Sequence, residues 1–197
     1  LHRDSSDDRL GVELVVGDIL VRSVVTKFKK LKFRTHENIG YGEISLPEDE
    51  MHTRSIVLVF PARLPSADLF AALPEERQGA LMRRLGYVVQ NVAPVFLLCD
   101  PRDIGIAERL RDPELGDPCL FVYDNYPGGT GLAEGFQKSF ASILAACLEV
   151  VARCPCRDGC PSCIGPPEAD EGQSLKESLR SFLAALFVLN DAPTYLE

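Results

Sequence analysis

The chain has 197 residues, of which 46% are hydrophobic and 25% are charged, and its mean hydropathy is close to zero. This composition is typical of a folded globular chain and argues against a disordered or membrane-embedded one. Acidic residues (29) outnumber Lys and Arg (21), and the formal net charge is −8. Such a balance argues against a free-standing, non-specific nucleic-acid-binding protein, which would normally be basic.

The first third of the chain predicts β-strands. Val, Ile, Leu and Phe dominate positions 11–33, and Gly17-Asp18 divides the run. Residues 35–42 form a turn-rich connector, and the polar residues 1–9 are expected to fray. The expected strands span 12–16, 19–25, 27–33, 43–46 and 53–60.

The remaining two thirds predict helices alternating with strands. Apolar residues recur at helical spacing over 75–92 and 130–152. Ser174 and Glu177 have the capping-box pattern that opens a last helix. Continuous apolar runs are typical of buried strands. Such runs lie at 94–99 and 120–123.

These elements predict an α+β fold. A β-rich subregion over 1–64 is followed by an α/β subregion over 65–197, in which a long helix leads into a cluster of cysteines. We expect the two to form one compact unit. The chain begins with Leu1 rather than Met, so we also expect it to be a fragment of a longer protein.

The chemical signal in the sequence is a group of four cysteines within ten residues. Their number and spacing are typical of a tetrahedral zinc site, with one ion per chain. Gly159 allows a left-handed turn between the two pairs. An iron–sulfur cluster and unliganded structural cysteines are the alternatives. The four candidate ligands are Cys154, Cys156, Cys160 and Cys163.

The other cysteines predict no site. Cys147 lies two helical turns before Cys154, about 10 Å away along the helix axis, which is too far for one ion to join them. We expect Cys99, Cys119 and Cys147 to be small buried apolar side chains. An odd number of cysteines without a signal peptide disfavours a disulfide scaffold, so we expect a cytoplasmic protein with no membrane partner.

Two weaker patterns point to other chemistry. The glycine-rich turn over 123–131 lies between a strand and a helix, where it could cradle a phosphate, but it lacks the Lys of a P-loop. Asp100, Asp103 and Asp124 each follow an apolar run, so they could form the clustered carboxylates of a metal-dependent nuclease. The alternative for both patterns is a local turn.

One segment of this acidic chain is basic. Residues 22–34 contain six basic residues and no acidic one. On a strand, alternation places Lys27, Lys29 and one further member on a common face, where they can meet phosphates. A solvated strand face is the alternative interpretation. The six candidates are Arg22, Lys27, Lys29, Lys30, Lys32 and Arg34.

Four segments in this order resemble one known family. The segments are THENIGYGEISLPE (35–48), CDPRDIG (99–105), YDNYPGGTG (123–131) and the cysteine cluster (154–163). They are similar to the MrfA-type zinc-binding domain, the C-terminal module of superfamily 2 DEAD/DEAH-box DNA helicases, and the resemblance runs from about Gly11 to Asn190.

The resemblance implies that the four clustered cysteines are zinc ligands. It also implies a parent protein that is an ATP-dependent, 3′-to-5′ DNA helicase acting in DNA repair, with ATP and Mg²⁺ as its cofactors. The chain itself contains no Walker A or DEAH motif. We therefore expect a non-catalytic module that stabilises the helicase motor domains of the same parent chain and helps to guide single-stranded DNA, which it would bind weakly.

Overall fold

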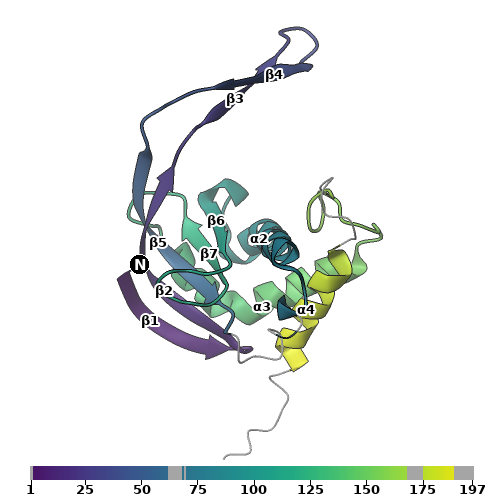
Figure 1. Ribbon diagram of the computed structural model, residues 1–197. Helices are drawn as coiled ribbons and strands as arrows, with labels where there is room; N and C mark the ends of the chain where they lie inside the picture. Colours follow the sequence, from purple (N-terminus) through teal and green to yellow (C-terminus); the bar gives the residue numbers. More distant parts are fainter. Residues whose placement is uncertain (1, 62–67, 69, 168–174, 189–197) are drawn as a thin grey trace, which may run out of the picture.

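The computed structural model describes residues 2–61, 68, 70–167 and 175–188. Its centre is a five-stranded antiparallel sheet with the strand order β1-β2-β5-β7-β6. Figure 1 shows this sheet with helices packed against it and a long ribbon of two strands leaving one end. The strands of the sheet are β1 (His2–Arg9), β2 (Val12–Ser23), β5 (Asp49–Val59), β6 (Ile104–Arg109) and β7 (Cys119–Asp124).

Strands from both predicted subregions share this sheet. β5 pairs with β7 in the register Val57↔Phe121, and β6 pairs with the other edge of β7. Strand alternation then gives the sheet two distinct faces. Residues 1–64 and 65–197 are therefore joined by backbone hydrogen bonds in the middle of one sheet.

One face of the sheet is covered by helices α2 (Glu75–Leu97), α3 (Leu132–Arg153) and α4 (Lys176–Val188). The main core lies between them. Apolar side chains of β2, β5 and β7 meet Phe136 and Phe140 of α3 and Phe182 of α4, all of which are fully buried. The helical stripe predicted in the sequence is the buried face of α3, which explains why this helix has a fixed position against the sheet.

By length and composition alone, α3 is apolar enough to cross a membrane. In the structure its apolar face packs against the sheet and against the other two helices. The same composition is therefore accounted for by a core helix.

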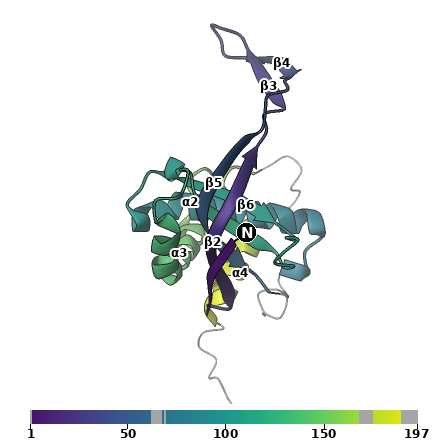
Figure 2. The same ribbon diagram turned by 90° about the vertical axis from the view of Figure 1, so that its left-hand side faces the viewer.

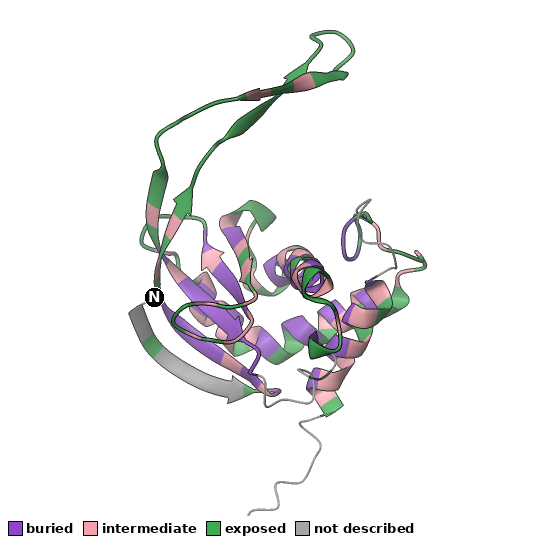
Figure 3. Cartoon of the chain, in the orientation of Figure 1, coloured by how far each residue is buried: buried purple, intermediate pink, exposed green. Residues whose placement is uncertain are grey.

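The ribbon in Figure 1 connects the end of β2 to the start of β5, and we call residues 24–48 the arm. Its strands, β3 (Lys27–Leu31) and β4 (Asn38–Glu43), pair only with each other among the described residues. Figure 2 shows the arm rising well clear of the helices, and the colouring of Figure 3 shows that its residues are mostly exposed.

The α+β class is confirmed, but several predicted elements are placed differently. The apolar run 94–99 is not a buried strand, because α2 continues to Leu97, and Val95 and Leu98 are 73% and 92% exposed. Residues 2–9 do not fray but form the edge strand β1. The expected connector 35–42 and strand 43–46 are replaced by β4, whose bounds overlap both.

Further differences concern β2, β6 and the start of the last helix. The expected strands 12–16 and 19–25 are one strand, β2, because β5 pairs with it continuously through Gly17. Strand β6 was not predicted from the sequence. The last helix is present as α4, but Ser174 of its predicted capping box lies outside the described residues.

Candidate metal centre and other candidate sites

The four clustered cysteines converge on a single point. Their Sγ atoms all lie within 4.8 Å of one another. The sulfur–sulfur distances are 3.5 Å for the pairs 154–156, 154–160 and 156–163 and 3.6 Å for 160–163. A tetrahedral zinc ion with zinc–sulfur bonds of about 2.3 Å has sulfur–sulfur edges of about 3.8 Å. The cysteine side chains therefore fit a four-coordinate zinc ion without rearrangement.

The first two ligand positions are set by the end of α3. Cys154 is the residue that ends this helix, and its backbone turns to an extended conformation while its N–H still donates to Val150. This change in direction carries Cys156 back toward Cys154. The stable core helix therefore delivers the first pair of sulfur atoms.

The second pair belongs to a tight turn that depends on glycine. The N–H groups of Cys163 and Gly165 both donate to the carbonyl of Cys160, at 3.0 Å each. Gly159 has φ of +118°, and a Cβ there would lie 2.7 Å from the Gly165 oxygen. The left-handed turn expected at Gly159 is confirmed, and a side chain at this position would clash with the loop.

Two other helices hold the cluster in place. From α2, Arg84 donates to the Ile164 carbonyl at 3.1 Å and the Tyr87 hydroxyl donates to the Pro161 carbonyl at 2.9 Å. From α4, the Lys176 ammonium donates to the carbonyls of Cys154 and Cys156 at 2.6 Å each. The loop that carries the cysteines is thus fixed by side chains from two helices, α2 and α4, and continues directly from the end of a third, α3.

Lys176 also supplies charge to the cluster. Its Nζ lies 3.4 Å from the Cys156 Sγ. Burial opposes ionisation of Cys156, but hydrogen bonds from Cys163, Cys154, Lys176 and the Gly159 amide lower the pKa of this thiol to about 7. The thiolate of Cys156 is therefore substantially populated at neutral pH, and thiolate is the form that binds metal.

The three remaining cysteines lie apart from this group. Cys119 and Cys147 are fully buried, and burial raises the pKa of each to about 12. These two are inert apolar side chains, as predicted. Cys99 differs from the prediction, because it follows α2 at its exposed end and is only half-buried.

The three aspartates and the glycine turn have local structural roles. Asp124 is buried and accepts hydrogen bonds from the N–H and hydroxyl of Thr130 and from the N–H of Leu132. This carboxylate thus occupies the N-terminus of α3, the kind of position that binds a phosphate in nucleotide-binding proteins.

Asp100 and Asp103 cap each other's backbone amides around the short 3-10 helix Pro101–Asp103. Among the described residues, the cysteines are the group whose ligand atoms converge on a possible metal position, and these aspartates do not join them. The arrangement favours the turn interpretation over a nuclease centre.

The six predicted basic residues are all exposed, but they do not form one surface. Arg22 is the second-last residue of β2 and pairs with Glu50, and Lys32 pairs with Glu37 in the turn of the arm. Lys27 and Lys29 share one face of the arm, as the alternation predicts. Lys30 lies on the opposite face.

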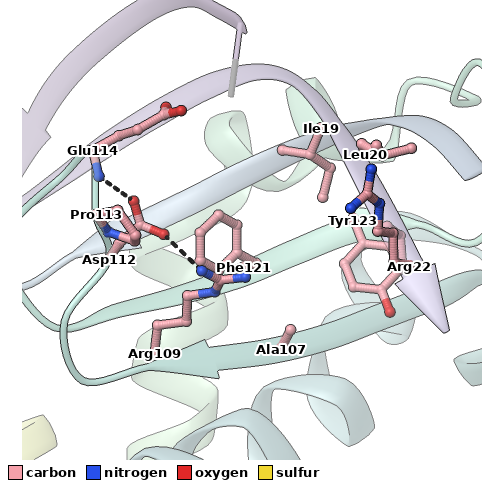
Figure 4. A pocket seen from close by; sticks show the side chains of 11 residues that line it. Ile19, Leu20, Arg22, Ala107, Arg109, Asp112, Pro113, Glu114, Phe121 and Tyr123 are labelled. Atoms are coloured by element: carbon pink, nitrogen blue, oxygen red, sulfur yellow. Dashed lines mark hydrogen bonds and ion pairs between the residues drawn. The ribbon is translucent and has the colours of Figure 1, made fainter. Parts of the chain in front are cut away.

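A cavity of about 350 Å³ lies on the sheet face opposite the helices, and the sequence did not reveal it. Figure 4 shows Phe121 and Tyr123 of β7 in its floor, with Arg109 and Arg22 beside them. Tyr123 lies across Gly105, where a Cβ would overlap its ring. The possible signal was the alternation of large and small residues on neighbouring strands, but strand order is needed to interpret it.

Comparison with known proteins identifies the family. A family model described as the MrfA Zn-binding domain matches residues 85–164, which include all four clustered cysteines. A protein of Methanocaldococcus jannaschii, MJ1572.1, is 35% identical over 86 residues, which is 77% of that protein and 42% of this chain. The chain belongs to the MrfA zinc-binding domain family.

Larger relatives of this family member are helicases by name. The ATP-dependent helicase YprA of Bacillus subtilis is 38% identical over 183 residues, which cover 93% of this chain and 23% of YprA. The crystal structure of the DUF1998 helicase MrfA bound to DNA superposes with a TM-score of 0.72 at 36% identity, covering 94% of this chain and 24% of MrfA.

A second MrfA crystal structure gives a TM-score of 0.65 at 31% identity, over 93% of this chain and 22% of MrfA. The chain thus spans about a quarter of the length of these helicases. The likeness extends over the sheet, the helices and the cysteine loop together, since it covers nearly all of the chain.

Proposed function

We propose that the chain is a zinc-binding, non-catalytic module of an ATP-dependent DNA helicase. The observation that carries the proposal is the cluster of four cysteine sulfur atoms at the spacing of a tetrahedral site, in a chain of the MrfA zinc-binding domain family. The ligands would be Cys154, Cys156, Cys160 and Cys163. Bound zinc would supply structural cross-linking, because four thiolates leave no open position for a substrate.

Metal analysis of the purified 197-residue chain tests this proposal. We expect about one zinc per chain after purification without added metal, and loss of zinc on Cys160→Ser. Cys147→Ala is the matched control, because this buried cysteine lies outside the cluster and its replacement should leave the zinc content unchanged. Several iron atoms per chain, or no metal, would contradict the assignment.

The helicase activity would reside in other parts of the parent protein. The chain has no Walker A or DEAH motif, and it spans about a quarter of helicases such as YprA. The parent would use ATP and Mg²⁺ to translocate 3′-to-5′ on DNA during repair in the cytoplasm, and the module would pack against its motor domains. DNA-stimulated ATP hydrolysis by the isolated chain would refute a non-catalytic role.

The arm is the part of the module proposed to contact single-stranded DNA. It carries five basic and three acidic residues, a net charge of +2, in a chain whose total is −8. A relative of similar fold has been crystallised bound to DNA. A few phosphate contacts on an acidic body predict a Kd of about 10⁻⁴ M or weaker at physiological salt. Changing Lys27, Lys29 and Lys30 together to Glu should abolish this binding.

A further inference from the structure

The phosphate contacts proposed for the arm do not involve its aromatic residues. Of the fifteen large apolar or aromatic side chains that are exposed among the described residues, nine belong to the arm. Exposed side chains gathered on one element indicate a binding surface. The set consists of Val24, Val25, Phe28, Leu31, Phe33, Ile39, Tyr41, Ile44 and Leu46.

Two of these aromatic residues, Phe28 and Tyr41, lie on opposite faces of the ribbon and differ in their surroundings. Phe28 pairs with Gly42, and a Cβ on Gly42 would overlap its ring, so this ring lies flat across the neighbouring strand. The Lys30 ammonium lies over the same ring, 5.8 Å from its centroid. Phe28 therefore holds the two-stranded ribbon together.

Tyr41 is on the other face. It pairs with Lys29, next to the pair Lys27 and Glu43, and 65% of it is exposed. Residues two positions apart on a strand, such as Lys27 and Lys29, are separated by about 6.8 Å. Their ammonium groups can therefore contact successive phosphates of an extended single strand of DNA. The ring of Tyr41, opposite Lys29 on the neighbouring strand, is then placed to reach a base of that strand of DNA.

We infer that Tyr41 stacks against an unpaired base of single-stranded DNA whose phosphates are held by Lys27 and Lys29. This inference rests on the proposed contact of the arm with single-stranded DNA and supplies a physical basis for the preference over duplex DNA. A base in a duplex is already stacked on both sides, whereas the ring of Tyr41 needs a base with one free face. Stacking tolerates any base, so no sequence preference is expected.

Titration with an oligothymidine ten nucleotides long separates stacking from phosphate contact. Using the fluorescein-labelled strand at about 50 mM salt, we expect Tyr41→Ala to lower affinity about fivefold or more, with an unchanged salt slope. Changing Lys27 and Lys29 together to Gln should instead reduce the slope of log K against log salt by about 1.4. A duplex of equal length should bind Tyr41→Ala and the unaltered chain equally.

Tyrosine emission gives an independent readout, because the chain has five Tyr and no Trp. Unlabelled oligothymidine should quench part of the emission of the unaltered chain. Tyr41→Phe should keep the affinity and lose this quenching, and the control Tyr126→Phe, an exposed tyrosine outside the arm, should keep both. Absence of any binding by the unaltered chain would overturn both proposals. Binding that survives Tyr41→Ala undiminished would overturn only the stacking.

Discussion

The cysteine loop and the arm both extend from the same core, but the loop is fixed by contacts with the helices and the arm is not. The loop receives hydrogen bonds from Arg84 and Tyr87 of α2 and from Lys176 of α4, and its first cysteine ends α3. The arm joins the body through the ends of β2 and β5 and has exposed side chains on both faces. A segment fixed from three sides is suited to hold an ion, whereas a segment free on both faces is suited to meet a partner.

This difference predicts which substitutions affect stability and which affect binding. Substitutions in the loop should alter the stability of the whole chain, because the loop connects the helices of the core. Substitutions in the arm should alter binding and leave the stability of the body unchanged.

The largest effect is expected from removal of the metal. Four thiolates without zinc leave the loop without its cross-link and bring their charges together. We expect a strong chelator to lower the free energy of unfolding by about 4 kcal/mol, which is roughly 8–16 °C in Tm for a chain of this size. Calorimetry before and after dialysis measures this change. A Tm that does not depend on zinc would mean that the three helices alone hold the loop.

The turn at Gly159 should give the next largest effect. Gly159→Ala places a Cβ 2.7 Å from the Gly165 oxygen at φ of +118°, so we expect a loss of about 2–4 kcal/mol in unfolding free energy. Gly116→Ala is the matched control, because this glycine also has positive φ but nothing lies within 4 Å of the added Cβ. The control should cost about 1 kcal/mol. Equal losses in chemical denaturation would show that the loop contact contributes nothing.

Lys176 should affect the metal more than the fold. Lys176→Met removes the hydrogen bonds to two carbonyls and a positive charge 3.4 Å from a sulfur atom. Together these losses should destabilise the zinc-bound state by about 1–3 kcal/mol. We expect zinc release to a chromogenic chelator to become at least several-fold faster. Lys176→Arg should restore most of the original rate, and Lys138→Met, at an exposed position of α3, should not change it.

The sequence was a sufficient guide to the cysteine loop because all four sulfur atoms come from ten consecutive residues. Their spacing and Gly159 determine the local chain path almost without help from the rest of the fold. The contact from Lys176 could not be predicted, since it depends on how α4 packs against the core. The same limit applies to the cavity beside Tyr123, which needs the order of the strands.

The strand predictions were wrong where the local sequence pattern and the tertiary structure favour different conformations. The run 94–99 is as apolar as a buried strand, yet α2 continues through Pro94 and leaves Leu98 exposed. Residues 2–9 have no apolar pattern, and they form an edge strand because the backbone of β2 offers hydrogen-bonding partners. Backbone pairing of this kind leaves little trace in composition.

The smallest effect on stability is expected in the arm, where a matched pair of glycines tests the comparison directly. A Cβ on Gly42 would overlap the Phe28 ring, and a Cβ on Gly86 of α2 would lie 2.7 Å from Ile106 of β6. Both changes add one methyl group against a side chain. Gly86→Ala acts within the core, so we expect it to lower the free energy of unfolding by about 1–3 kcal/mol.

Gly42→Ala acts on a ribbon whose exposed side chains add little to the core, so its effect on the global free energy should stay within about 0.5 kcal/mol. Its effect should be local. Displacing the Phe28 ring removes a side-chain contact that supports the backbone pairing of β3 and β4, and a two-stranded ribbon is at best marginally stable alone. Amide exchange over 27–43 should therefore accelerate while exchange in β5 and β7 does not change. If Gly42→Ala instead destabilised the body as much as Gly86→Ala, the arm would be part of the folding unit, and its exposed surface would need another explanation.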